Sequence, residues 1–276
     1  MNSQKKLDKE IAFIGSGNMA ISILSGLVEK GYERSKLRIS DPDPEQRRRA
    51  EEFGVGLFED NNECINGAEL ILICVKPQIV KKVCQALTST SGQLVISIAA
   101  GITTKALSDW LPREQSIIRC MPNTPALIRQ GITGLYANEY STPEQKENTE
   151  QLLGSVGNTL WVTEENKLDV ITAISGSGPA YFFYLMEQMV MAGIELGITE
   201  NEALELTLQT ALGAARLANR EQQDTPKSLR EKVTSPGGTT QSALQTFKDH
   251  GMDEAFRLGI KNAFLRSKEL SQEFGN

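Results

Sequence analysis

The sequence predicts an α/β protein in which a mostly parallel sheet is followed by an all-helical domain. Three observations carry this prediction. Strand and helix signals alternate from the start of the chain to about Glu165, no strand signal returns after that point, and a glycine-rich turn follows the first expected strand. Such alternation is typical of parallel strands that are covered by helices on both faces of the sheet.

Short apolar runs bounded by turn residues predict the strands, and apolar positions at helical spacing predict the helices between them. Pro42 and Pro44 end the second strand, because proline can begin a helix but cannot continue a central strand. The expected strands are Glu10–Gly15, Lys36–Asp41, Val55–Phe58, Leu70–Val75, Leu94–Ile98, Ile117–Cys120, Ile132–Ala137 and Thr159–Thr163, and the expected helices are Asn18–Lys30, Glu45–Phe53, Gln78–Thr88, Thr103–Trp110 and Pro143–Leu153.

The rest of the chain shows only helical signals, at Ser177–Gly197, Glu202–Asn219 and Asp253–Phe274. The first of these is apolar nearly all round, so it must be buried in a core or against another subunit. The remaining residues of this half are too few to surround it. We therefore expect two domains, 1–165 with the sheet and 166–276 with the helices, and we expect the helical domain to form a homodimer.

Composition excludes several classes of protein. The chain has 276 residues, a net charge of −6 and a pI near 5.1. Because no basic surplus is available to neutralise phosphates, a nucleic-acid partner is not expected. The longest apolar runs fall far short of the roughly 20 residues of a membrane span, and the polar start does not resemble a signal peptide. We expect a cytoplasmic protein without a membrane partner.

The cysteines and the histidine argue against metal and triad chemistry. Cys64, Cys74, Cys84 and Cys120 form no C-x-x-C pair and lie mostly in apolar segments, which indicates buried free thiols in a reducing compartment. His250 is the only histidine, and its polar surroundings are typical of a helix end. No metal site and no Ser-His-Asp triad are therefore expected.

The turn from Gly15 to Ala20 has the spacing of a dinucleotide fingerprint. Gly15 allows a tight turn from strand to helix, Gly17 lets the backbone approach a pyrophosphate, and Ala20 permits close packing of helix on strand. The N-terminus of the helix would then face the phosphates. An ordinary strand-turn-helix packing is the alternative, but the position of the motif, between a first strand and a second that ends in an acidic residue, favours a cofactor.

Asp41 stands at the end of the second expected strand, 24 residues after Gly17. Its carboxylate could accept hydrogen bonds from the ribose hydroxyls of NAD. Arg47, Arg48 and Arg49 follow closely and could meet the 2′-phosphate of NADP, although a solvated helix face is an equally good interpretation of this run. The residues alone leave both dinucleotides open.

Three more segments lie where expected strands end, at the edge where an open α/β sheet binds ligands. Prolines hold extended corners in Val75-Lys76-Pro77 and in Met121-Pro122-Asn123-Thr124-Pro125. In Ser97-Ile98-Ala99-Ala100-Gly101, small side chains would let a flat nicotinamide lie against the backbone. Each segment alone could be a structural turn, but their shared position indicates a cofactor site.

A second loop of interest, Thr234-Ser235-Pro236-Gly237-Gly238-Thr239-Thr240, precedes an expected helix. Its hydroxyls and backbone N–H groups at a helix N-terminus suit a small anion such as a carboxylate. Two glycines and two threonines in succession exceed what a helix cap requires. For Ser177-Gly178-Pro179 we prefer a structural interpretation, with Ser177 as the N-cap and Pro179 in the first turn of a helix.

Taken together, six motifs closely resemble those of the pyrroline-5-carboxylate reductases, and the match runs almost end to end. The motifs are Phe13–Met19, Val75–Pro77, Ser97–Gly101, Met121–Pro125, Ser175–Tyr181 and Thr234–Thr240. The resemblance implies a Rossmann domain and a helical dimerisation domain, with dimers that in some members assemble into larger rings. It also implies reduction of the imino acid 1-pyrroline-5-carboxylate to L-proline with NADPH or NADH, the last step of proline biosynthesis.

The resemblance further implies site residues. The cofactor would be bound by Ile14, Gly15, Ser16, Gly17, Asn18, Met19, Asp41, Asn61, Val75, Lys76, Pro77, Ala99, Ala100, Gly101 and Asn123. The substrate carboxylate would lie on Ser235 and the N–H groups of Gly238 and Thr239, with the catalytic Thr240 near the ring nitrogen. Family members often carry Ser or Thr where this chain has Asp41, a departure that argues against a strong preference for NADPH.

The implied reaction explains why no acid–base pair stands out in the second domain. A protonated cyclic imine accepts hydride at carbon without a strong acid, so the enzyme must chiefly supply orientation. Thr240 suits orientation of the ring nitrogen first and proton delivery second, because a hydroxyl of ordinary pKa is a poor general acid.

Two other functions compete with this interpretation. A 3-hydroxyacid dehydrogenase has a similar plan but carries a catalytic lysine soon after its second-domain glycine motif, and Gly176–Val190 contains none. A non-catalytic dinucleotide sensor would keep the first fingerprint without needing the loop from Ser235 to Thr240.

Overall fold

The computed structural model describes residues 7–88, 92–220 and 223–275. The chain forms two compact units. One reaches as far as Ser177 and takes in the chain again from Ala263, and the other consists of Gly178–Asn262. The expected domains, 1–165 and 166–276, differ from this division, because the short helices after residue 165 and the last turns of the final helix belong to the unit that contains the sheet.

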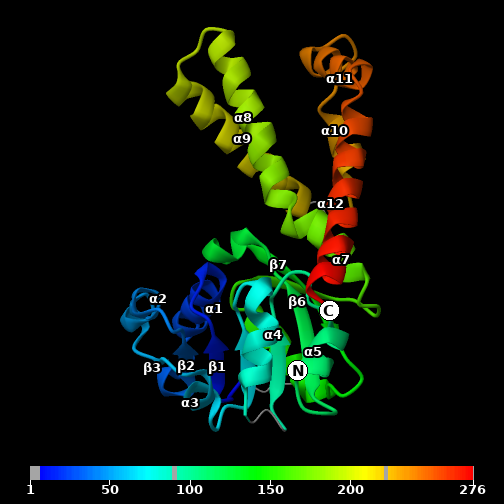
Figure 1. Ribbon diagram of the computed structural model, residues 1–276. Coiled ribbons are helices and arrows are strands. Elements are labelled where there is room, and N and C mark those ends of the chain that lie inside the picture. Colours follow the sequence, from blue (N-terminus) through cyan, green and yellow to red (C-terminus); the bar gives the residue numbers. More distant parts are fainter. Residues whose placement is uncertain (1–6, 89–91, 221–222, 276) are drawn as a thin grey trace. The chain divides into compact units, whose positions relative to one another are not determined.

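The first unit is built on an eight-stranded sheet in the order β3-β2-β1-β4-β5-β6-β7-β8 (Figure 1). All neighbouring pairs are parallel except β6 and β7. This confirms the expected mostly parallel sheet, and the strand ends differ from the expected ones by two residues at most. The strands are β1 (Ile11–Ile14), β2 (Leu37–Ser40), β3 (Gly56–Phe58), β4 (Leu70–Ile73), β5 (Leu94–Ser97), β6 (Ser116–Met121), β7 (Gly131–Ala137) and β8 (Gly157–Trp161).

Successive residues of the central strands point to opposite faces, and helices cover both. On β1, Ile11 and Phe13 belong to a core shared with α1 (Asn18–Glu29) and α6 (Pro143–Leu153), whereas Ala12 and Ile14 pack with α3 (Asn61–Ile65). The second face continues over β4 to β6 under α4 (Pro77–Ala86) and α5 (Thr104–Trp110). Burial on both faces explains why these strands are apolar throughout.

Two expected helices of the first unit differ from those in the structure by two residues or more at one end. The segment expected as Glu45–Phe53 is a short helix, α2 (Pro44–Arg48), followed by a 3₁₀ turn, η2 (Glu51–Phe53). The backbone amides of Arg49 and Ala50 donate to carbonyls three residues earlier, which tightens and ends α2. The helix expected at Gln78–Thr88 ends at Ala86. Two further 3₁₀ turns lie at Arg34–Lys36 (η1) and Thr124–Ile128 (η3).

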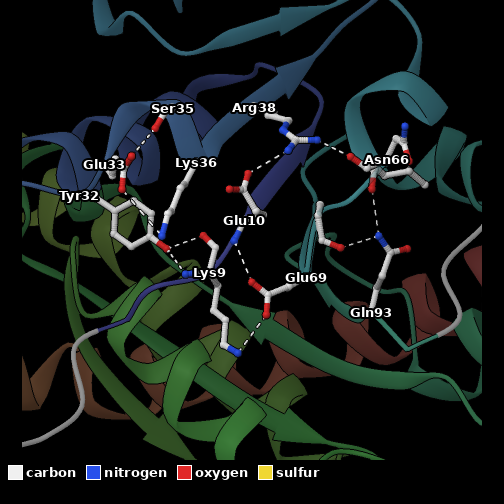
Figure 2. Close-up of polar contacts among 12 residues, drawn as sticks. Lys9, Glu10, Tyr32, Glu33, Ser35, Lys36, Arg38, Asn66, Glu69 and Gln93 are labelled. Atoms are coloured by element: carbon white, nitrogen blue, oxygen red, sulfur yellow. Dashed lines mark hydrogen bonds and ion pairs between the residues drawn. The ribbon is translucent and has the colours of Figure 1, made fainter.

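Polar side chains brace the sheet at the edge where its strands begin (Figure 2). The hydroxyl of Tyr32 accepts from the backbone amide of Lys9 at 2.8 Å and donates to the Lys9 carbonyl at 2.6 Å. The ammonium of Lys9 lies 3.0 Å from Glu69, and Arg38 Nη2 lies 2.9 Å from Glu10. This braced edge is the one opposite the glycine-rich turn.

The helices of the second unit are α8 (Gly178–Glu195), α9 (Glu200–Arg220), α10 (Pro226–Lys232), α11 (Thr239–Asp249) and the first part of α12 (Met252–Phe274). Helices α8 and α9 form a hairpin (Figure 1), and a Cβ on Gly193 would lie 2.9 Å from that of Ala203. The rings of Tyr181 and Phe256 meet edge to face at 6.1 Å and join α8 to α12. The described part of this unit contains no strand, which confirms the expected all-helical character.

Ser177 does not begin a helix. Helix α7 (Lys167–Ile171) continues through a π-helical turn, η4 (Thr172–Gly176), into α8. Ser177 has helical backbone angles, φ −85° and ψ −20°, and its amide donates to the carbonyl of Thr172 at 2.8 Å. The expectation that Ser177 is an N-cap is therefore wrong, because an N-cap has extended backbone and Ser177 lies inside a helical run.

Candidate active site

The glycine-rich turn joins the ends of three neighbouring strands. Gly15 follows β1, has a φ of +94° and donates its amide to the carbonyl of Ser40 at the end of β2 (2.8 Å). A Cβ at this position would lie 2.8 Å from Cγ1 of Val75, just beyond β4. Both the positive φ and this close approach require glycine.

Gly17 is the N-cap of α1, with extended backbone (φ −66°, ψ 174°) and no side-chain cap on the helix. A Cβ here would meet nothing nearer than the carbonyl oxygen of Cys74 at 4.0 Å. The space beside Gly17 is therefore open, and the first backbone N–H groups of α1 are available to an anion. This cradle fits the pyrophosphate of a dinucleotide.

The carboxylate of Asp41 lies directly behind this turn. Its Oδ2 accepts from the backbone amide and from the hydroxyl of the buried Ser16, each at 3.0 Å, and its Oδ1 accepts from the amide of Asp43 at 3.0 Å. Arg47 donates to the Asp41 carbonyl at 2.5 Å. Asp41 is consequently held in one orientation beside the phosphate-binding turn.

Two further side chains follow the same pattern at this edge. The hydroxyl of Ser40 donates to Oδ1 of Asn61, the first residue of α3, at 2.8 Å. Arg49 Nη2 donates to Oδ1 of Asn18 at 2.8 Å, which brings one member of the arginine run to the start of α1.

The ends of β4 and β5 continue the edge. Lys76 is the N-cap of α4 and Pro77 its first residue. After β5 comes Ala99, which is buried, and then Gly101 with a φ of +77°. The side chains here are small, and Ala100 is the partly exposed member of the segment, so a flat ring could stack there.

Asn123 follows β6 and is used to hold loops together. Its Nδ2 donates to the carbonyl of Ser175 in η4 at 3.2 Å, and its Oδ1 accepts from the amide of Ile132 at 3.0 Å. The two ends of this side chain thus join η4 to β7.

The structure therefore gathers the expected cofactor residues at one edge of the sheet. They are Ile14–Met19, Asp41, Asn61, Val75–Pro77, Ala99–Gly101 and Asn123. The expected substrate residues, Ser235–Thr240, lie in the other unit.

The loop of the second unit is shaped by its glycines. Gly237 has a φ of +71°, and its amide donates to Oε1 of Gln241 at 2.5 Å. The amide of Gly238 donates to the carbonyl of Ser235 at 3.1 Å, and the Ser235 hydroxyl lies where a Cβ of Gly238 would be. The loop folds back so that the Ser235 hydroxyl is close to the start of α11.

Helix α11 begins directly after this loop. Gly238 is its N-cap, has extended backbone (φ −82°, ψ 170°) and provides no side-chain cap. Ser235, Thr239 and Thr240 are all exposed. Hydroxyls and helix N–H groups are thus presented together to solvent, as a carboxylate site requires.

Nothing in the described part of the chain offers a metal site, and its cysteines are free thiols. Burial raises the pKa of the Cys64 thiol to about 11 and that of Cys84 to about 12, and it also raises the pKa values of Cys74 and Cys120. These thiols are poor nucleophiles.

His250 caps the C-terminus of α11, as expected, with Nδ1 at 2.9 Å from the carbonyl of Thr246.

Sequence analysis missed a buried ionic cluster close to Gly101. Arg119 on β6 lies 3.0 Å from Glu165 and 4.0 Å from Asp169, and its side chain is only 5% exposed. The signal was present, since Arg119 interrupts an otherwise apolar strand. Its partners could not be recognised, because they lie in a polar stretch that is distant in sequence.

Exposed apolar side chains occur on α8, α9 and α12 and on one outer part of the sheet. On α8, Phe182, Phe183 and Tyr184 are each 64–65% exposed. A nearly wholly apolar cavity of about 190 Å³ lies over β7 and β8, lined by Ile132, Gly134, Leu160, Val170, Ile171, Ile174 and Ser175. Exposed apolar surface of this kind marks an interaction site.

Among the described residues, no helix combines the length and apolar character that crossing a membrane demands.

Comparisons with known proteins agree over almost the whole chain. Residues 165–270 match the family model for pyrroline-5-carboxylate reductase dimerisation, and residues 10–101 match the model for coenzyme F420-dependent NADP oxidoreductases. The pyrroline-5-carboxylate reductase of Pseudomonas aeruginosa is 47% identical over 96% of this chain and 98% of its own length. That of Haemophilus influenzae is 41% identical over 96% and 99%.

Solved structures give the same result. A pyrroline-5-carboxylate reductase from Coxiella burnetii superimposes with a TM-score of 0.90 at 40% identity, covering 95% of this chain and 98% of that one. The Plasmodium falciparum pyrroline carboxylate reductase, solved with NADP bound, gives a TM-score of 0.86 at 25% identity over 97% and 100% of the two chains.

Proposed function

This chain belongs to the pyrroline-5-carboxylate reductase family, and we propose that it holds NADPH at the carboxyl edge of its sheet and the substrate carboxylate on the loop before α11. It is an oxidoreductase that uses NADP(H) to reduce the cyclic imine 1-pyrroline-5-carboxylate to L-proline, the last step of proline biosynthesis. The resemblance inferred from the motifs is confirmed by the relatives. The assignment of roles to individual residues is the proposal.

The single observation that carries the cofactor assignment is that the expected residues follow the ends of six strands, β1 to β6, at one edge of the sheet. The open space beside Gly17, at the uncapped start of α1, suits the pyrophosphate. The ribose side would meet Asp41, Asn61 and the segment Val75–Pro77. The nicotinamide would lie against Ala99–Gly101, where the side chains are small and Ala100 is partly exposed.

Asp41 makes NADH a second acceptable cofactor. A carboxylate repels a 2′-phosphate and can accept hydrogen bonds from a 2′-hydroxyl. Arg49, which reaches Asn18 at the start of α1, can offset this repulsion when NADPH is bound. The balance between these two side chains sets the cofactor ratio.

The substrate carboxylate would be held by the Ser235 hydroxyl and by the N–H groups of Gly238 and Thr239, the first of which would exchange its bond to the Ser235 carbonyl for one to the substrate. This arrangement fixes the ring, and the hydroxyl of Thr240 would accept a hydrogen bond from the protonated ring nitrogen. When bound, NADPH supplies the hydride that reduces the iminium carbon. The nitrogen keeps the proton it already carries, so the enzyme needs no strong acid, and orientation is the main contribution of the chain.

The exposed apolar surface is the basis of a homodimer. Side chains such as Phe182, Phe183 and Tyr184 cannot remain in water without cost, and residues 165–270 match a dimerisation model. We propose that a second copy covers α8. We also propose that it contacts the apolar cavity over β7 and β8, since Val170, Ile171 and Ile174 line that cavity and lie within the matched segment 165–270. Free, buried thiols fit a reducing compartment such as the cytoplasm.

One assay tests the function against its competitors. The oxidation of NADPH is followed with 1-pyrroline-5-carboxylate and with no substrate. The reduction of NADP⁺ is followed with a panel of 3-hydroxyacids. We expect turnover only with 1-pyrroline-5-carboxylate. Turnover with a hydroxyacid instead would indicate a 3-hydroxyacid dehydrogenase, and cofactor binding without any turnover would indicate a sensor.

A further inference from the structure

The buried cluster around Arg119 connects four parts of the sheet unit. Arg119 Nη1 lies 3.0 Å from Oε1 of Glu165, and Nη2 lies 4.0 Å from Oδ1 of Asp169. The same Asp169 oxygen accepts from the hydroxyl of Ser267 in the last part of α12 at 2.7 Å. Exposure of these side chains is low, with Arg119 at 5% and Asp169 at 9%. The cluster therefore joins β6, α7 and α12 through charges that are largely removed from water.

Glu165 extends the cluster to the start of α5. Its Oε1 accepts from the backbone amide of Thr104 at 2.7 Å, and its Oε2 accepts from the Thr104 hydroxyl at 2.7 Å. Thr104 is the first residue of α5 and follows Gly101 by only three positions. Fixing Thr104 therefore fixes one end of the segment Ala99–Gly101.

The end of α12 supports the same segment from another side. A Cβ on Gly101 would lie 3.2 Å from the backbone and Cβ of Leu270. Phe274 packs against the core cluster that contains Ala99 and Ile102. Ser267, which Asp169 holds, lies one turn before Leu270 on this helix. The segment is thus held between α5, which Glu165 fixes, and α12, which Asp169 fixes.

Stability alone is a weak reason for such a cluster. Burying two carboxylates with one guanidinium is costly, and apolar side chains of similar size often do as well or better. What the cluster supplies is geometry, because five directed contacts specify where α5 and α12 lie relative to β6. The segment that gains this precision is Ala99–Gly101.

We propose that Arg119, Glu165, Asp169 and Ser267 are positioning residues for the nicotinamide end of the cofactor. The proposal rests on the placement of the nicotinamide at Ala99–Gly101. None of the four touches the reacting atoms. They set the position of the backbone against which the ring stacks, and hydride transfer depends on that position more steeply than binding does.

The variants Glu165→Gln and Ser267→Ala test the proposal, with Lys105→Ala as the matched control. Lys105 lies on the outer side of α5, with a side chain 82% exposed. For the two variants we expect kcat to fall about tenfold to a hundredfold, while the Kd of 2′-phospho-ADP-ribose, which lacks nicotinamide, changes by less than about twofold. The deuterium isotope effect with NADPH labelled at the transferred hydrogen should rise, because hydride transfer becomes slower. Lys105→Ala should leave kcat, the Kd of 2′-phospho-ADP-ribose and the isotope effect unchanged.

Two conservative substitutions of Thr104 test the bond to Glu165. Thr104→Ser keeps the hydroxyl that bonds to Glu165 and should retain the wild-type isotope effect, whereas Thr104→Val should behave as Glu165→Gln does. A Glu165→Gln enzyme with lowered unfolding temperature but wild-type kcat and isotope effect would overturn the proposal, as would an equal loss of affinity for the fragment. Ala100→Val tests the placement of the nicotinamide separately, since unchanged NADPH affinity in that variant would overturn the placement itself.

Discussion

The carboxylate of Asp41 accepts two hydrogen bonds from Ser16, one from the backbone amide and one from the hydroxyl, both at 3.0 Å. Ser16 is fully buried within the glycine-rich turn. Asp41 therefore holds the glycine-rich turn in addition to the role proposed for it at the ribose. A substitution at Asp41 must be chosen so that these roles separate.

Asp41→Asn removes the charge but keeps an oxygen that can accept from Ser16. We expect the ratio of kcat/KM for NADPH to that for NADH to rise about tenfold, or ~1.4 kcal/mol, because repulsion of the 2′-phosphate is lost. Asp41→Ala, the companion variant, should also weaken both cofactors by loosening the turn. Steady-state kinetics with each cofactor measures the ratio of the two kcat/KM values. An unchanged ratio in Asp41→Asn would show that the carboxylate does not face the ribose.

Gly17→Val should abolish tight binding of both dinucleotides while preserving the fold. The backbone of Gly17 is in a region open to any residue, and the nearest atom to a new Cβ is 4.0 Å away. The side chain would enter the space proposed for the pyrophosphate, and we expect affinity to fall by more than about tenfold. Fluorescence titration with NADPH and with NADH measures the two affinities. Thermal unfolding serves as the control for the fold. Retained affinity would remove Gly15–Met19 from the site.

Thr240→Ala should lower kcat/KM for 1-pyrroline-5-carboxylate by roughly 5- to 150-fold, equivalent to about 1–3 kcal/mol. The hydroxyl is exposed at the second position of α11, so its loss should not disturb packing. Ser235→Ala should chiefly raise KM, because the carboxylate is present equally in ground and transition states. The two variants are compared at saturating NADPH. Wild-type kcat/KM in Thr240→Ala would mean that the loop holds substrate by its backbone alone, or not at all.

Phe183→Glu should cause aggregation or unfolding rather than a stable active monomer. Phe183 is 64% exposed in the chain, and in a dimer the new charge would be buried without a partner. Gln188→Glu, which adds the same charge at an exposed polar position of α8, is the comparison. Analytical ultracentrifugation checks both, and a wild-type protein that sediments as a monomer at micromolar concentration would contradict the prediction.

Alkaline pH should destabilise the fold through its buried thiols. In the native state the pKa of Cys64 is raised by burial to about 11 and that of Cys84 to about 12, above the ordinary value of 9.0. Below pH 9 the thiols are protonated in both native and unfolded states, so they leave stability unchanged. Between pH 9 and 11 only the unfolded chain ionises, and each thiol lowers the free energy of unfolding by up to about 1.4 kcal/mol per pH unit.

Urea unfolding at pH 8, 9.5 and 10.5 measures this loss. The variant Cys64→Ala lacks one such group and should show a shallower decline than wild type over the same range. A decline of equal slope in both proteins would assign the alkaline loss to other groups.

The sequence by itself determined the sheet and the cofactor edge. Apolar runs of strand length, broken by proline and glycine, marked the central strands, because burial on both faces leaves little room for polar residues. The glycine positions were informative for a similar reason: Gly15 has a positive φ and touches Val75, so no other residue type fits. Both features leave a pattern in consecutive residues, so both can be recognised in the sequence.

Only the tertiary structure decided how distant polar residues pair. Arg119, Glu165, Asp169 and Ser267 meet because β6, α7 and α12 come together, and no local pattern specifies such a meeting. Ser177 shows the same limit in a helix, since glycine and proline around it predicted a start where the backbone continues through a π turn. Directed contacts between remote segments depend on how those segments pack, whereas strand and turn preferences depend on neighbours along the chain.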